Sequence, residues 1–163
     1  MKNLLIMRHA KSDWGNNLPD IERPLNNRGK KAAPLMADYL KKVKKKPDII
    51  LSSPANRALS TALIMKETLG LDKDIKIVKA FYFGYMDELI DVIKNIDNNY
   101  DTVLIVGHNP VWEDLVSDLS GNIDFIMPTA AIASIIFETD DWQKILEVKS
   151  KLEWSVTPKG LKS

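Results

Sequence analysis

The sequence predicts an α/β protein, a three-layer α/β/α sandwich built on a mainly parallel β-sheet. Short apolar runs typical of buried strands alternate along the chain with longer segments whose apolar residues recur at a helical period. This alternation is typical of parallel strands joined by helices that lie on both faces of the sheet. The chain has 163 residues and no internal repeat or linker, so we expect one domain over 1–156 and a flexible tail over 157–163.

The first half of the chain is predicted to alternate strand, loop, helix, strand and helix. Residues 4–7 form a continuous apolar run, typical of a strand buried on both faces, and the Asp-, Asn-, Gly- and Pro-rich segment 12–28 predicts a loop. A helical period follows Gly29, and Pro47 ends that helix. Residues 48–51 then predict a strand and 56–69 a helix, which Gly70 closes.

The second half continues this alternation and ends in two late strands. Residues 75–80 alternate as in a strand, 87–96 have helical spacing, and the apolar run 102–106 is the clearest strand of the chain. Pro110 suits the first turn of a helix that runs to about Leu119. The last predicted strands span 130–137 and 144–148.

Composition argues against several classes of function. The 23 basic and 22 acidic residues leave a formal charge of +1, which gives no broad field for holding a nucleic acid or a membrane, so we expect neither as a partner. The absence of cysteine excludes a thiolate metal site and a cysteine nucleophile, and agrees with a reducing cytoplasm. No stretch approaches the roughly 20 apolar residues of a membrane span, and the opening run is too short for a secretory signal. We expect a soluble, cytoplasmic protein.

Arginines and histidines follow three of the predicted strands. The first strand is followed by Arg8 and His9, the second leads to Arg57 in the first turn of a helix, and the strand 102–106 is followed by Gly107 and His108. Ligands of open α/β sheets bind beyond the carboxyl ends of the strands, so these side chains are expected to converge. One such residue alone is usually structural, but two histidines and two arginines in one crevice favour a functional site.

These residue types favour phosphoryl transfer without a metal ion or cofactor. Guanidiniums donate planar, bidentate hydrogen bonds to phosphate oxygens, and a helix N-terminus adds backbone N–H groups. An imidazole beside bound phosphate can attack phosphorus and form a covalent phosphohistidine. The arginines and the second histidine would neutralise the charge on the equatorial oxygens.

Three motifs resemble those of the histidine phosphatase superfamily, the phosphoglycerate-mutase-like enzymes. They are Arg8-His9-Ala10-Lys11-Ser12-Asp13-Trp14, Ser52-Ser53-Pro54 with Arg57, and Gly107-His108-Asn109-Pro110. The short length and the segment Thr129-Ala130-Ala131-Ile132-Ala133-Ser134 resemble in particular the SixA-type phosphohistidine phosphatases. The resemblance implies a phosphoglycerate-mutase-like fold. It also implies that His9 carries the phosphoryl group, that Arg8 and Arg57 clamp it, that His108 hydrogen-bonds it as a cation, and that Ser12 contacts it.

The chain departs from the superfamily pattern at the proton donor. Many members carry a glutamate three residues before a Phe-Gly pair, and this position is Ala80 here. An alkoxide leaving group needs a proton, whereas an imidazole protonated on its distal nitrogen leaves as a neutral ring. The departure therefore favours an N–P substrate, although Asp87 or Glu88 is a candidate acid unless it only stabilises its helix dipole. A second departure is Gly15, where mutase-like members place a phosphate-binding asparagine; either Asn16 substitutes for it or the contact is absent.

The sequence thus predicts a phosphatase that removes phosphate from phosphohistidine on a protein. One alternative is a phosphatase of small phosphate monoesters, which would need its acid at Asp87 or Glu88. Another is a non-catalytic sensor of phosphate or of a phosphoprotein. A mutase would need additional segments that enclose the substrate, and a receiver domain would need acidic residues after the first strand, where this chain has Arg8 and His9.

Overall fold

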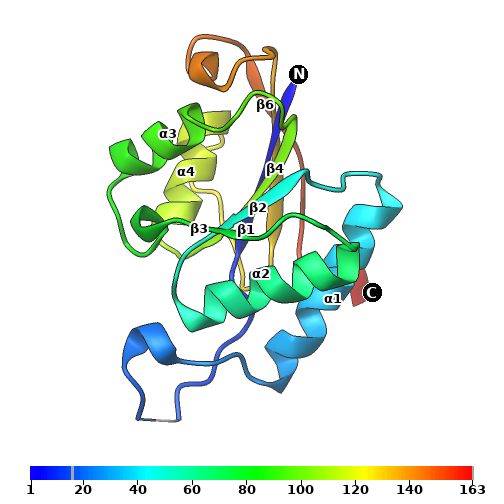
Figure 1. Ribbon diagram of the computed structural model, residues 1–163, viewed down its shortest axis with the longest axis vertical. Helices are drawn as coiled ribbons and strands as arrows, with labels where there is room; N and C mark the ends of the chain where they lie inside the picture. The colour runs from blue at the N-terminus through cyan, green and yellow to red at the C-terminus, as the bar shows by residue number, and fades with distance from the viewer. Residues whose placement is uncertain (16, 163) are drawn as a thin grey trace.

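A six-stranded β-sheet in the order β3-β2-β4-β1-β5-β6 forms the centre of the computed structural model, which describes residues 1–15 and 17–162 (Figure 1). The strands are β1 (Lys2–Arg8), β2 (Ile49–Ser52), β3 (Lys76–Ile77), β4 (Thr102–Gly107), β5 (Ile132–Phe137) and β6 (Ser150–Val156). The pairs β3–β2, β2–β4 and β4–β1 are parallel, whereas β5 is antiparallel to both β1 and β6. The predicted mainly parallel sheet is confirmed.

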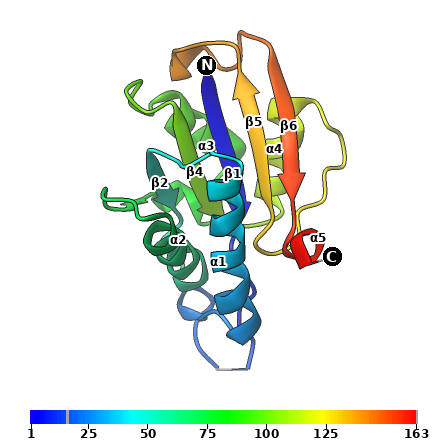
Figure 2. The ribbon, with the colours of Figure 1, turned by 90° about the vertical axis from the view of Figure 1, so that its right-hand side faces the viewer.

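Helices cover both faces of this sheet (Figure 2). The helices are α1 (Asn27–Lys42), α2 (Asn56–Leu69), α3 (Met86–Lys94), α4 (Val111–Ser120) and α5 (Pro158–Lys162), with 3-10 turns η1 (Asp20–Glu22), η2 (Lys79–Phe81) and η3 (Trp142–Lys144). Residues of α1, α2 and α5 pack in one hydrophobic cluster, and residues of α3 and α4 pack in a second cluster on the opposite face. The predicted three-layer α/β/α sandwich is confirmed.

Strand β1 contributes side chains to both hydrophobic clusters. Leu4 and Ile6 pack with the α3 and α4 side, Leu5 and Met7 pack with the α1 and α2 side, and all four are fully buried. This position explains why the strand is continuously apolar instead of alternating. Burial of each such side chain contributes about 1.5–3 kcal/mol. This burial fixes the position of β1 and therefore of Arg8 at its carboxyl end.

The predicted strand 144–148 is wrong, because its apolar residues anchor a turn. Ile145 is buried there, after Trp142, whose Nε1 donates to the Tyr100 carbonyl at 2.8 Å. The sixth strand is instead β6, which has a register shift opposite Ser134 and Ile135 of β5. The shift places Leu152 in one hydrophobic cluster and Trp154, two residues later, in the other. A bulge of this kind breaks the alternation from which strands are predicted.

The segment 157–162, expected to belong to a flexible tail, contains helix α5 in the structure. Leu161 of this helix is partly buried and packs against the cluster that includes Ala33 and Met36 of α1. One apolar residue in a short polar segment is too weak a signal for a helix, but it suffices to attach the segment to a neighbouring surface. Ser163 lies outside the described residues.

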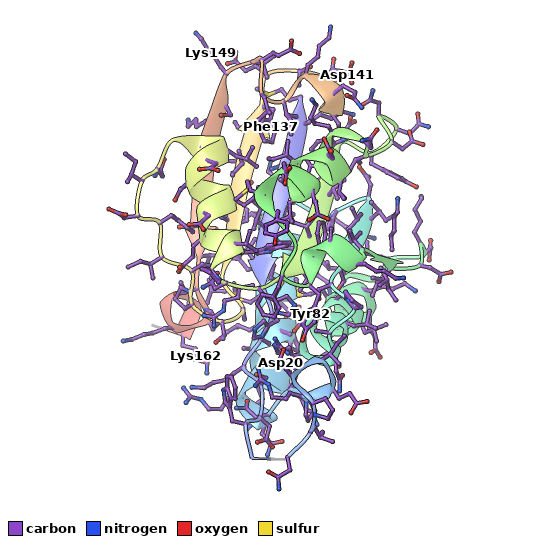
Figure 3. All side chains as sticks on the ribbon, turned by 90° about the vertical axis from the view of Figure 1, so that its left-hand side faces the viewer. Asp20, Tyr82, Phe137, Asp141, Lys149 and Lys162 are labelled. Atoms are coloured by element: carbon purple, nitrogen blue, oxygen red, sulfur yellow. The ribbon has the colours of Figure 1, made fainter. Side chains whose placement is uncertain are left out.

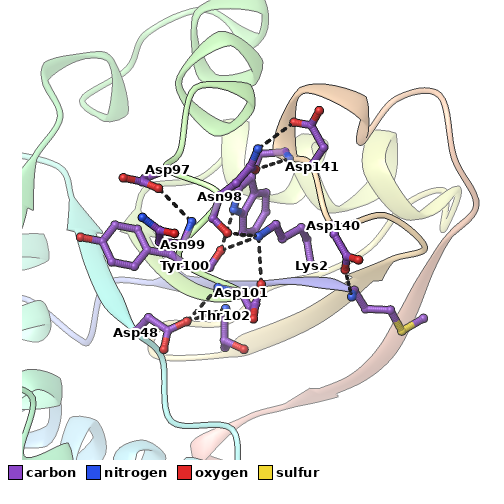
Figure 4. Close-up of polar contacts among 12 residues, drawn as sticks. Lys2, Asp48, Asp97, Asn98, Asn99, Tyr100, Asp101, Thr102, Asp140 and Asp141 are labelled. Atoms are coloured by element: carbon purple, nitrogen blue, oxygen red, sulfur yellow. Dashed lines mark hydrogen bonds and ion pairs between the residues drawn. The ribbon is translucent and has the colours of Figure 1, made fainter.

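A buried lysine ties the start of β1 to the segment before β4 (Figure 4). The ammonium of Lys2 donates to the carbonyls of Asn98 at 2.7 Å and Tyr100 at 3.1 Å, and to Oδ1 of Asp101 at 2.9 Å. Its side chain is only 1 % exposed. Since an ammonium has three donors, each of them is satisfied here.

We predict that Lys2→Met destabilises the protein by about 2–4 kcal/mol, because it removes all three hydrogen bonds of the buried ammonium while keeping a side chain of similar length. Urea unfolding followed by circular dichroism measures this difference. Lys149→Met, at an exposed lysine, is the control and should change the free energy of unfolding by less than about 0.5 kcal/mol. Equal effects of the two substitutions would show that the Lys2 contacts carry no specific stability.

Candidate active site

The carboxyl ends of β1, β2 and β4 bring the predicted site residues into one cavity of about 260 Å³. Arg8 and His9 follow β1, Arg57 lies in the first turn of α2, and His108 follows β4; all four line the cavity together with Ser12. The rings of the two histidines are 5.3 Å apart between centroids. The convergence expected from the sequence is thus present in the structure.

The backbone carbonyl of the next residue, Ala10, holds His9 in one tautomer. Nδ1 lies 2.7 Å from the carbonyl oxygen of Ala10, and because a carbonyl only accepts, this nitrogen carries the hydrogen. Burial is the main cause that lowers the pKa of His9 to about 4; the Ala10 contact opposes it, and the charges of Arg57 and Arg8 add to it. The imidazole is therefore neutral near pH 7, with a free electron pair on Nε2.

His108 is also neutral near pH 7, and the cation expected where the ring contacts bound phosphate stays a prediction. Burial lowers its pKa to about 3, and the neighbouring His9 and Arg57 lower it further. Nε2 lies 2.8 Å from Oγ of Ser53, a hydroxyl that also accepts from the Ala55 amide at 3.2 Å. In the tautomer in which the Ser53 hydroxyl donates to Nε2, the hydrogen of His108 is on Nδ1. A bound dianion would reverse the sign of the local field and favour the charged ring.

Three buried nitrogens of the cavity residues have no hydrogen-bond partner within the described part of the chain. They are Nε of Arg8, Nε of Arg57 and Nδ1 of His108. Unpaired buried donors are costly, and an anionic ligand would satisfy them. Their presence in one cavity indicates a site for an oxyanion such as phosphate.

Asp20 is a residue of the site that the sequence analysis missed. Its carboxylate accepts from Arg57 at 3.1 Å, from Tyr82 at 2.7 Å and from Arg23 at 3.2 Å, and its carbonyl accepts from Arg57 at 2.8 Å. Figure 3 shows Asp20 and Tyr82 side by side. Burial favours a raised pKa, but the hydrogen bonds from Tyr82, Arg57 and Arg23 outweigh it and lower the pKa of Asp20 to about 2. The group is an ionised acceptor.

Arg23 is a third guanidinium of the cavity and was also missed. It donates to Oγ of Ser12 at 2.9 Å and lies over the ring of Trp14, 3.5 Å from its centroid. Aromatic stacking of this kind fixes the plane of a guanidinium. Both Asp20 and Arg23 lie in the segment predicted only as a loop. The one signal that could have found them is their charge, which is common in surface loops.

Contacts between loops fix the position of the Arg8-His9 segment. Thr61 of α2 accepts from the Ala10 amide at 2.9 Å and donates to the Arg57 carbonyl at 2.7 Å, so it joins two walls of the cavity. On the other side, the Ala130 amide donates to the carbonyls of Arg8 at 3.1 Å and His9 at 3.0 Å. The motif that ends with Ser134 therefore lies beside the histidine predicted to be the nucleophile.

The structure does not bring Asp87 or Glu88 into the cavity. Both are exposed in the first turn of α3, where Oδ1 of Asp87 accepts from the Glu88 amide and Oε1 of Glu88 accepts from the Tyr85 amide. Glu88 thus bonds back to the N-cap residue Tyr85, and both carboxylates lie at the positive end of the helix dipole, the structural alternative considered from the sequence. Gly15 does not line the cavity either, and Asn16 lies outside the described residues.

Neither a metal site nor a membrane span is present among the described residues, 1–15 and 17–162. No group of three or more His, Asp or Glu side chains there has an arrangement that could hold a metal ion. No helix in the same part of the chain has the length and apolar character needed to cross a membrane.

Comparison with known proteins gives the family. Residues 4–81 match the model of the histidine phosphatase superfamily, branch 1. An uncharacterized protein of Mycobacterium leprae is 30% identical over 160 residues, which are 88% of this chain and 94% of that protein. The chain belongs to the histidine phosphatase superfamily. The resemblance found in the motifs is thereby confirmed.

Relatives of this histidine phosphatase differ in substrate. The phosphohistidine phosphatase SixA of Escherichia coli K12 is 26% identical over 164 residues, 98% of this chain and 96% of SixA. The structure of a protein histidine phosphatase SixA complexed with tungstate has a TM-score of 0.86 at 26% identity, covering 98% of this chain and 99% of that one. A mycobacterial glucosyl-3-phosphoglycerate phosphatase shares the fold at a TM-score of 0.73 and 15% identity. The match covers 94% of this chain and 98% of that one.

The two histidines predict a loss of stability in mild acid. Each has a folded-state pKa below the ordinary 6.5, so as the pH falls the unfolded chain takes up protons first. Stability is complete above about pH 6.5 and decreases by about 2 kcal/mol for each histidine at pH 5. Urea unfolding at pH 7.5 and 5 measures the loss.

The matched variant is His9→Gln with His108→Gln, which removes both imidazoles of a chain that has two. Its free energy of unfolding should be nearly constant between pH 7.5 and 5. A variant as acid-sensitive as the wild type would show that other groups cause the loss.

Proposed function

We propose that this histidine phosphatase hydrolyses phosphohistidine on proteins through a covalent phospho-His9 intermediate. The observation that carries the proposal concerns the leaving group. Among the described residues, the one carboxyl that lines the cavity is Asp20, and its hydrogen bonds hold it ionised. A site without a protonated acid suits a leaving group that departs without one.

In the first step, Nε2 of His9 attacks phosphorus and the N–P bond of the substrate breaks. The bond pair returns to the substrate imidazole, which leaves as a neutral ring when its distal nitrogen carries a hydrogen. His9 becomes cationic on phosphorylation, since Nδ1 keeps its hydrogen, and the Ala10 carbonyl at 2.7 Å stabilises that charge. The contact that fixes the tautomer thus also supports the intermediate.

The transferred group is neutralised by the cations around it. Arg8 and Arg57 each have an unpaired Nε donor, and His108 has an unpaired Nδ1 donor held in place through Ser53. Donors fixed before the reaction stabilise the charge on the equatorial oxygens with little reorganisation. We therefore propose that Arg8, Arg57 and His108 bind the phosphoryl group, and that Ser12, which accepts a hydrogen bond from Arg23, lies in the same wall.

In the second step, water attacks the phosphorus of phospho-His9. The new P–O bond forms as the P–N bond breaks, the bond pair returns to Nε2, and both hydrogens of the water leave on the product, dihydrogen phosphate. His9 is then neutral again in its original tautomer. The absence of cysteine from the chain supports a reducing, cytoplasmic location for this activity.

We predict that a phosphohistidine peptide is hydrolysed faster than small phosphate monoesters in the presence of a chelator, and that His9→Ala abolishes turnover. Arg57→Ala should reduce kcat/KM by a factor of about 10²–10³. Phosphate release measures these rates. The double variant Asp87→Asn with Glu88→Gln is the control and should keep wild-type turnover. Preference for monoesters together with loss of activity in this control would favour the small-molecule alternative, and no turnover of any substrate would favour the sensor.

A second prediction concerns aryl phosphates with different leaving groups. Without an acid, kcat/KM should fall steeply, by up to about tenfold for each unit of leaving-group pKa. Steady-state rates for a series of phenyl phosphates give this slope. The matched variant is Asp20→Asn, which keeps the size of the side chain and removes its charge. A shallow slope that becomes steep in Asp20→Asn would identify Asp20 as a proton donor and contradict the assignment of Asp20 as an ionised acceptor.

A further inference from the structure

A second cavity, of about 450 Å³, adjoins the active site. Four of its lining residues are the cations Lys11, Arg28, Lys159 and Lys162. Two of its lining residues, Lys11 and Thr129, also line the active-site cavity. A ligand that occupies both cavities therefore passes over a shared wall. We call this second cavity the basic pocket.

Three separate parts of the chain build the basic pocket. Lys11 follows the Arg8-His9 segment, Arg28 lies in the first turn of α1, and Lys159 and Lys162 lie on α5. The loop and α1 approach each other closely at Gly29, where a Cβ atom would lie 2.2 Å from the Lys11 carbonyl. Helix α5 packs against α1 near the end of β6 (Figure 2). The four cations are thus gathered by the fold.

The charges of the basic pocket are not compensated within the described part of the chain. None of its lining residues is acidic, and none of the four cations is in an ion pair there. All four are exposed. In a protein with a formal charge of only +1, such clustering creates a local positive potential beside the active site.

We propose that the basic pocket binds carboxylates that flank the phosphohistidine of the protein substrate. This inference rests on the proposed function, because the phosphoryl group then occupies the cavity at His9. Three of the four cations are lysines, which are mobile point charges, unlike the fixed and hydrogen-bonded guanidiniums of the active site. Mobile ammoniums distributed over about 450 Å³ suit several dispersed carboxylates better than one compact second phosphate. Their attraction selects acidic substrates and accelerates their association.

The test compares two phosphohistidine peptides that differ only in their flanking residues, Asp and Glu in one and Asn and Gln in the other. We expect the wild type to prefer the acidic peptide by about tenfold in kcat/KM at low salt. In Lys159→Gln with Lys162→Gln this ratio should approach one. High salt should lower the wild-type ratio in the same direction.

The control is Lys149→Gln with Lys151→Gln, which removes the same charge far from the basic pocket. Figure 3 shows Lys149 at the top of the molecule and Lys162 well separated from it, in the lower half. This variant should keep the tenfold preference. The reversed variant Lys159→Glu with Lys162→Glu should prefer the neutral peptide, and thermal unfolding confirms that each variant is folded.

Three results would overturn the inference. They are equal rates of the wild type on both peptides, a preference that survives in Lys159→Gln with Lys162→Gln, and a preference that the control variant also loses. A fourth result would also contradict it: the wild type prefers a small bisphosphate over its monophosphate, this preference depends on Lys159 and Lys162, and the two peptides are hydrolysed equally fast.

If neither peptide is hydrolysed, the proposed function fails separately from the basic pocket. Calorimetry with the unphosphorylated acidic peptide then decides whether the pocket binds carboxylates. Binding that weakens several-fold in Lys159→Gln with Lys162→Gln supports the pocket, and equal or absent binding contradicts it.

Discussion

The buried imidazole of His9, neutral among three arginines, is the constraint on which the site depends. A nucleophilic nitrogen needs a free electron pair, and burial together with the surrounding cations keeps the proton off Nε2, while the Ala10 carbonyl holds the other proton on Nδ1. Such a concentration of positive charge is unfavourable for the unliganded protein. The central position of β1, with both faces buried, and the ties through Thr61 and Ala130 hold the segment in place despite that repulsion.

The sheet and the centre of the site could be predicted because their signals are local. The continuous apolar run of β1 records burial on two faces, and Arg8 and His9 stand next to it in the sequence. The same rule found His108 after β4 and Arg57 in the first turn of α2. Parallel strands place their carboxyl ends at one edge, so the topology alone predicts that these residues converge.

Other features depend on contacts between distant segments, which leave no local signal. The bulge opposite Ser134 hides the alternation of β6, and Asp20 is a partner of Arg57 only after the loop folds back over α2. The pKa of His108 depends on distant contacts in a similar way. Its pKa follows from burial and from the summed field of its neighbours, and neither can be read from the residues next to it.

The hydrogen bonds between Asp20 and Arg57 give the site an internal competitor. Both terminal nitrogens of Arg57 already donate to Asp20, through its carbonyl and its carboxylate. An incoming anion must either bind the remaining donor, Nε of Arg57, or displace the Asp20 carboxylate. Because Asp20 belongs to the same chain, its carboxylate is present at a high effective concentration. Weakly basic inorganic anions such as chloride have little advantage in that exchange, whereas a phosphoryl dianion has both the charge and the geometry to succeed. The loop that carries Asp20 thus sets a threshold of binding strength, and the arginine stays available for substrate in a medium rich in simple salts.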